Sequence, residues 1–202
     1  MNREKRVGRR SEDFTRRHAR LLTGIATIAA IASLISATGC KQGVKAVVDV
    51  ASFIPPERLT GSYTVPAGSS AIDLQVQPVA LDLAPAVQGL ANAETMTLDV
   101  STRFNTTSGR GSGSATVFFG ATAENVYSTP PVATLEATLA AGQSTKSSVQ
   151  IPIDSRVLAL FQSGKLWMGM RLHWAPTGPE ALAGQYTITK IQAQVVSRRG
   201  VV

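Results

Sequence analysis

Apolar and polar residues alternate along most of the chain beyond residue 44, and helical periodicity is almost absent. A period of two is typical of strands that present one side to a core and the other to solvent. The alternating segments are residues 45–53, 59–65, 72–83, 96–104, 115–119, 132–139, 149–153, 165–174 and 186–196. About nine strands without long helices between them predict an all-β fold, an antiparallel β-sandwich, rather than parallel βαβ units.

Breaks in the alternation predict the remaining elements. Pro78 interrupts one run, and the alternation then resumes in a shifted register, which predicts a bulge at a sheet edge. Asp154 and Gly164 flank residues 156–162 as an N-cap and a terminating glycine, so one short helix is expected there. The glycine-rich segment 107–113 lacks the Lys-Ser/Thr pair of a phosphate loop and is interpreted as a flexible hairpin loop.

The net charge of +7 is concentrated near the N-terminus. Residues 41–202 hold twelve Lys or Arg and ten Asp or Glu, a net charge of only +2, so no basic stripe for nucleic acid is expected. Residues 45–202 have the size of one domain, and we expect them to form a single sandwich. With one cysteine in the chain, this domain must be stable without an internal disulfide.

The first 40 residues have a separate organisation. A basic head, residues 3–20, precedes seventeen uncharged residues, 21–37, and the only cysteine follows as Cys40. As a helix this run would span about 25 Å, less than the hydrocarbon core of about 30 Å, so a removable export signal fits better than a permanent span. Arg16 and Arg17 resemble a twin-arginine signal, so export of a folded chain remains an alternative to export of an unfolded one.

The segment Ala37-Thr38-Gly39-Cys40 resembles the lipobox of bacterial lipoproteins, and this resemblance covers residues 1–40 only. It implies a signal peptide at residues 1–39, cleavage before Cys40, and lipid on the Cys40 thiol, with residues 40–44 as a short tether. Several acyl chains together hold a protein firmly on a membrane. Lys41, where family members retained at the inner membrane carry Asp, implies a place on the periplasmic side of the outer membrane in a Gram-negative host.

Residues 165–174 form the most distinctive predicted strand. One face carries Trp167, Arg171 and His173, which could be a ligand face on which a sugar stacks. The alternative is a covered tryptophan beside a surface histidine. Only one histidine follows Cys40, and no acidic or histidine cluster has metal-ligand spacing, so we expect no catalytic set, no metal and no cofactor.

Together these features predict a membrane-anchored envelope lipoprotein with a non-enzymatic binding or structural role. Its partner would be an envelope protein or a glycan, not nucleic acid. A small hydrolase of envelope polymers, dependent on His173, and a carrier of lipid or another apolar ligand remain alternatives. A polar cleft at His173 beside a carboxylate or hydroxyl favours the enzyme, an apolar cavity favours the carrier, and a flat apolar patch or free strand edge favours partner binding.

Overall fold

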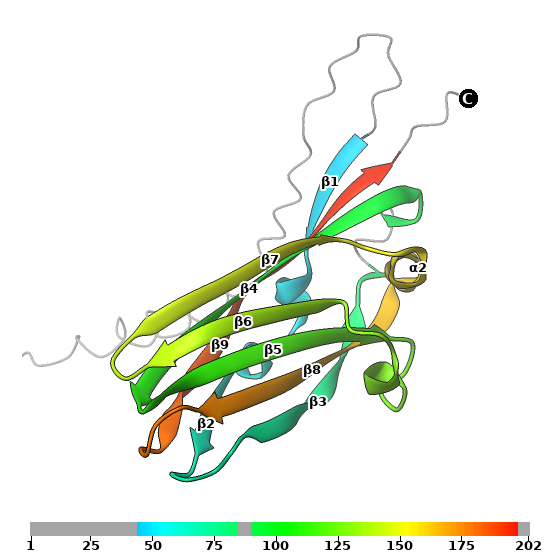
Figure 1. Ribbon diagram of the computed structural model, residues 1–202. Helices are drawn as coiled ribbons and strands as arrows, with labels where there is room; N and C mark the ends of the chain where they lie inside the picture. The colour runs from blue at the N-terminus through cyan, green and yellow to red at the C-terminus, as the bar shows by residue number, and fades with distance from the viewer. Residues whose placement is uncertain (1–43, 85–89, 198–202) are drawn as a thin grey trace, which may run out of the picture. The chain divides into compact units, whose positions relative to one another are not determined.

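The computed structural model describes residues 44–84 and 90–197, and these form nine strands in two antiparallel sheets (Figure 1). Sheet A contains β1 (Val44–Asp49), β2 (Thr60–Val65), β4 (Ala93–Ser108), β7 (Ser144–Pro152) and β9 (Leu182–Ser197). Sheet B contains β3 (Ile72–Asp82), β5 (Arg110–Gly120), β6 (Ala133–Ala140) and β8 (Lys165–Pro176). The predicted all-β antiparallel sandwich is confirmed.

Sheet A has the strand order β1-β9-β4-β7, and sheet B has the order β3-β8-β5-β6. β1 and β2 share one strand position, because β1 pairs with residues 192–197 of β9 and β2 pairs with residues 182–187. Eight strand positions divided in this way between two sheets make a jelly roll. The strand predicted at residues 45–53 ends early, since Asp49 leads into the 3-10 turns η1 (Val50–Phe53) and η2 (Pro56–Arg58).

The sandwich interior is filled by the alternate residues of both sheets, as the sequence pattern predicts. On β8 these are Leu166, Met168, Met170, Leu172 and Trp174, each at most 4% exposed. At one end of the interior the Trp174 ring stacks on Tyr63 with 4.9 Å between ring centroids, and Tyr186 lies 6.3 Å away. This aromatic cluster closes the space between the two sheets.

The bulge predicted at Pro78 is confirmed as a register shift between Val76 and Val79 on β3, an edge strand of sheet B. Tyr127, from the 3-10 turn η4 (Val126–Ser128), holds this region in place. Its hydroxyl donates a hydrogen bond to the carbonyl of Val76 and accepts one from the amide of Met170 at 3.1 Å. These hydrogen bonds hold the β5–β6 connection against the outer face of sheet B, at β3 and β8.

The interpretation of residues 107–113 as a flexible loop was wrong. β4 continues to Ser108 and β5 begins at Arg110, so the turn is reduced to Gly109, which has a φ of 72°. Gly111 and Gly113 lie inside β5 and are buried. A Cβ at Gly111 would lie 2.3 Å from the backbone oxygen of Ala175, so the glycines here allow close packing of strands.

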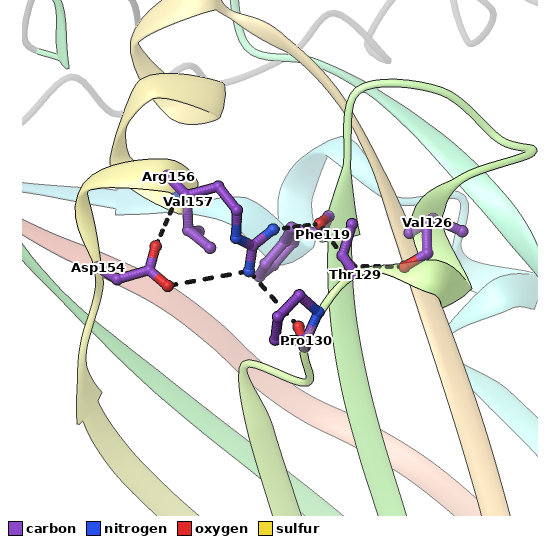
Figure 2. Close-up of polar contacts among 7 residues, drawn as sticks. All are labelled: Phe119, Val126, Thr129, Pro130, Asp154, Arg156 and Val157. Atoms are coloured by element: carbon purple, nitrogen blue, oxygen red, sulfur yellow. Dashed lines mark hydrogen bonds and ion pairs between the residues drawn. The ribbon is translucent and has the colours of Figure 1, made fainter.

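The predicted short helix is confirmed as α2 (Ser155–Ser163), which lies where β7 leads into β8 (Figure 1). The Asp154 side chain accepts a hydrogen bond from the Val157 amide at 2.8 Å, and Gly164 ends the helix with a φ of 72°. Figure 2 shows the Arg156 guanidinium reaching from α2 to the carbonyls of Phe119, at 3.3 Å, and Pro130, at 3.5 Å. These contacts join the helix to the end of β5 and to the β5–β6 connection.

Stability is expected to fall above about pH 10, the ordinary pKa of tyrosine. Burial raises the pKa of Tyr63, Tyr127 and Tyr186, which are the three tyrosines of the chain. A raised pKa means that the folded state favours the neutral phenol. This preference stabilises the protein fully at a pH below the tyrosine pKa of the unfolded chain. The stabilisation is lost as the pH rises through the tyrosine pKa of the folded protein. Denaturant unfolding followed on both sides of this pH, together with tyrosinate absorbance, would check the prediction. An unchanged midpoint would contradict it.

Candidate functional site

The outer face of sheet B carries a line of polar side chains that crosses all four strands. Asp73 on β3 is the register partner of His173 on β8, His173 is the partner of Ser114 on β5, and Ser114 is the partner of Glu136 on β6. Directly opposed residues on neighbouring strands have Cβ atoms about 4.5–5.5 Å apart. These four residues, which we call the polar row, are therefore near neighbours despite their separation in sequence.

His173 and Asp73 form a defined pair within the polar row. Nδ1 of His173 lies 2.9 Å from Oδ1 of Asp73, and the two side chains are 44% and 69% exposed. When the imidazole is neutral, a carboxylate at Nδ1 favours the tautomer with its proton on that nitrogen. Nε2 is then the acceptor that the ring can offer to a ligand.

A hollow of about 410 Å³ lies beside this pair. It is lined by Ser112, Gly113, Ser114, Glu136, Ala137, Thr138 and His173. We call it the polar hollow, since its side-chain chemistry consists of three hydroxyls, one carboxylate and one imidazole. Hydroxyls both donate and accept hydrogen bonds, whereas the carboxylate only accepts them, so the lining can match a ligand rich in polar groups.

Trp167, Arg171 and His173 share the outer face of β8, but they do not form one site. Trp167 is six residues from His173, or about 20 Å along an extended strand. Between them the Tyr127 ring covers Gly169, where a Cβ would lie 2.8 Å from that ring. The Arg171 guanidinium lies over aromatic rings, 5.2 Å from the centroid of Phe118 and 6.0 Å from that of Tyr127. Only His173 of the three lines the polar hollow.

The order Asp73, His173, Ser114 places an acid, a base and a hydroxyl on adjacent strands. A serine nucleophile needs a hydrogen bond to its base and donors for the developing oxyanion. Among the described contacts, none joins Ser114 to His173. β5 lies between β8 and β6, so its backbone N–H groups lie in the plane of the sheet and serve the two ladders. In the described residues the row thus has an acid–base pair, Asp73 and His173, without a serine hydrogen-bonded to the base.

Sequence reasoning singled out His173 but missed the other members of the polar row. Asp73 was not among the predicted site residues, and it lies 100 positions from His173 in the sequence. Ser114 follows the segment interpreted as a loop, yet residues 111–117 alternate small apolar residues with hydroxyl residues. That alternation is the signal that could have placed Ser112 and Ser114 on the outer face of a strand.

Several predicted residues lie outside the part of the chain that the structure describes. These are the lipidation site Cys40 and the residues of the proposed cleavage signal, Ala37, Thr38 and Gly39. Within residues 44–84 and 90–197, no helix combines the length and the apolar character needed to cross a bilayer. In the same residues no three His, Cys, Asp or Glu side chains are grouped so that they could hold a metal ion.

No protein-family model matches the chain, and no curated protein matches it. Among solved structures, it is similar to chains of infectious bursal disease virus of the Gx strain (11% identity, TM-score 0.41) and the Gt strain (9%, 0.43). In both matches 88% of this chain is covered, and it spans 37% and 39% of the viral chains. A virus-like particle of Macrobrachium rosenbergii nodavirus is similar at 10% identity and a TM-score of 0.26, with 90% of this chain and 97% of that chain covered. Similarities this remote carry no inference about function.

Proposed function

We propose that the chain is an envelope lipoprotein, anchored through Cys40, whose jelly roll binds a hydroxyl-rich envelope glycan in the polar hollow without changing it chemically. The polar hollow is the observation that carries the binding role. The lipobox-like segment that ends at Cys40 supports the anchor. A protein of this kind would hold its ligand next to a membrane surface.

The short tether supports a role close to the membrane. β1 begins at Val44, four residues after Cys40. An extended chain gains at most about 3.6 Å per residue, so the start of β1 stays within about 15 Å of a lipid-bearing Cys40. In a Gram-negative host the sandwich would lie at the periplasmic side of the outer membrane, beside the glycan polymers of the envelope.

The lining of the polar hollow is suited to sugar hydroxyls. The hydroxyls of Ser112, Ser114 and Thr138 can donate or accept, while Glu136 and Nε2 of His173 supply acceptors. None of the lining residues is Trp, Tyr or Phe, so the hollow lacks the large aromatic ring on which a sugar usually stacks. We therefore expect moderate affinity that depends on hydrogen bonds, in particular those to the ionised carboxylate.

The test of ligand binding uses soluble peptidoglycan fragments and the double variant Glu136→Gln with His173→Gln. Loss of a charge-assisted hydrogen bond should weaken binding about tenfold or more in calorimetry. The control variant Gln75→Ala alters an exposed residue of the same outer face that does not line the hollow, and it should bind as the unaltered protein does. An equal loss in both variants, or no glycan binding by the unaltered chain, would refute the proposed ligand.

The anchor is tested in cells that express the full chain. The native chain should incorporate labelled palmitate and sediment with membranes, and Cys40→Ala should abolish the incorporation. Label that persists after Cys40→Ala would exclude Cys40 as the acylated residue. A native chain that takes up no label would refute the lipoprotein assignment.

A small hydrolase of envelope polymers is the second candidate, favoured by the alignment of Asp73, His173 and Ser114. If the protein is such a hydrolase, the purified chain should shorten peptidoglycan or remove its ester groups. The variant Ser114→Ala should then abolish that activity. Activity that survives Ser114→Ala would exclude Ser114 as its nucleophile.

A further inference from the structure

The outer face of sheet A carries two cations opposite one another. Arg103 on β4 and Lys146 on β7 are direct register partners, and both are exposed. Among the described residues, neither forms an ion pair. Like charges directly opposed on neighbouring strands destabilise a sheet. An anion bound between them would remove this cost.

The described strands of sheet A around Arg103 and Lys146 offer no free counter-charge. This end of the face consists of β2, residues 182–190, residues 99–108 and residues 144–150, in which Asp99 is the only acidic residue. Asp99 is already engaged in an ion pair with Lys190. The outward side chains there include the neutral polar residues Ser62, Asn105, Ser144, Ser148, Gln185 and Thr187. Such a surface complements an anionic partner.

The other end of the same face lies beside the tether. Lys45 and Val47 point outward from β1, and Val47 is 63% exposed, a high value for an apolar side chain. Val47 pairs with Gln194, which pairs with Thr97, and Thr97 lies six residues before Arg103 on β4. At about 3.3 Å per residue, the two ends of the face are separated by about 20 Å.

We infer that the outer face of sheet A is the membrane-facing surface of the protein and binds anionic phospholipid headgroups through Arg103 and Lys146. This inference rests on the proposed lipid anchor. The anchor alone would let the sandwich pivot on its tether, whereas a second contact about 20 Å away holds the face along the bilayer. Each basic residue near an anionic surface adds attraction that salt screens. Sheet B, with the polar hollow, then faces away from the membrane.

The test measures which face of the lipidated protein lies near the lipid. Cys40 is the only cysteine, so once it is acylated an introduced cysteine is the only free thiol. A fluorophore is placed on Ser148→Cys, on the outer face of sheet A, or on Gln75→Cys, on the outer face of sheet B. The mature protein is reconstituted in vesicles of phosphatidylcholine, with or without phosphatidylglycerol, that contain lipids with a quencher on the headgroup.

Quenching is expected to be strong at position 148 and weak at position 75, to require phosphatidylglycerol, and to decline with added salt. The double variant Arg103→Gln with Lys146→Gln should reduce quenching at position 148 to the level at position 75. The control variant Arg110→Gln with Lys165→Gln removes the same charge from exposed residues of sheet B and should leave quenching unchanged.

Two outcomes would overturn the inference while the anchor stands. One is equal quenching of the two faces in a chain that incorporates palmitate, and the other is quenching at position 148 that is independent of phosphatidylglycerol. A chain that incorporates no palmitate would instead refute the proposed function and this inference with it.

Discussion

Replacing Trp174 with alanine is expected to lower the free energy of unfolding by about 3–5 kcal/mol, the range typical of large aromatic truncations in a core. Trp174 is 2% exposed and stacks on Tyr63 at 4.9 Å, so the truncation would leave a void between the two sheets. The indole Nε1 is buried without a hydrogen-bond partner among the described residues. The loss would therefore come from packing rather than from a broken hydrogen bond. Denaturant unfolding would measure it.

Two further variants make this result specific. Trp167→Ala removes the same side chain from the same strand, but Trp167 is only half-buried on the outer face, so its cost should be clearly smaller. Trp174→Phe keeps an aromatic ring and removes the unpaired N–H, so it should retain most of the stability lost in Trp174→Ala. Equal costs for the two alanine variants would show that Trp174 does not hold the sheets together.

Replacing Gly111 with alanine is expected to cost about 3 kcal/mol, the upper part of the range for overpacked positions. The new methyl carbon would lie 2.3 Å from the backbone oxygen of Ala175 and 3.0 Å from a Leu182 methyl carbon. Because Ala175 is the register partner of Ser112, next to Gly111 on β5, its backbone cannot shift without disturbing the β5–β8 ladder. Thermal or denaturant unfolding of the purified variant would show the loss.

Gly178→Ala is the matched control, since a Cβ at Gly178 meets nothing within 4 Å. Its stability should stay within a few tenths of a kcal/mol of the unaltered protein, as is usual for surface substitutions. If Gly111→Ala proved as mild as Gly178→Ala, the close approach of β5 to β8 would be disproved.

Alternation located strands best where the two faces differ in chemistry. Residues 96–104 and 165–174 were predicted as strands from their alternation, and the apolar faces from Met96 to Phe104 and from Leu166 to Trp174 are buried in the structure. The pattern was less informative on β7, where only residues 149–153 were predicted as strand although β7 begins at Ser144. As an edge strand it begins with polar residues on both faces, which leaves no contrast to detect. β5 was shortened for a related reason, since Gly111 and Gly113 face inward without an apolar side chain.

The candidate site could be predicted only in part, because it depends on which strands pair and in which register. One strand places His173 on an outer face, but its neighbours come from three other strands. Nothing local in the sequence shows that Asp73 on β3 or Ser114 on β5 will stand beside His173. Such pairings are set by the whole arrangement of hydrophobic faces, in which a shift of one residue would turn each side chain to the other side.

The division of one strand position between β1 and β2 determines how the sandwich responds to mechanical load. A force that pulls Val44 away from the sheet edge is expected to break the six β1–β9 register pairs one after another, starting at Val44. We expect this opening to stop at Val50 and Ile54, because they are 0% and 4% exposed and hold the following turn in the core. β2 remains paired with the other half of β9. Under tension we therefore expect β1 to detach and extend first, while the other strands of the sandwich stay folded.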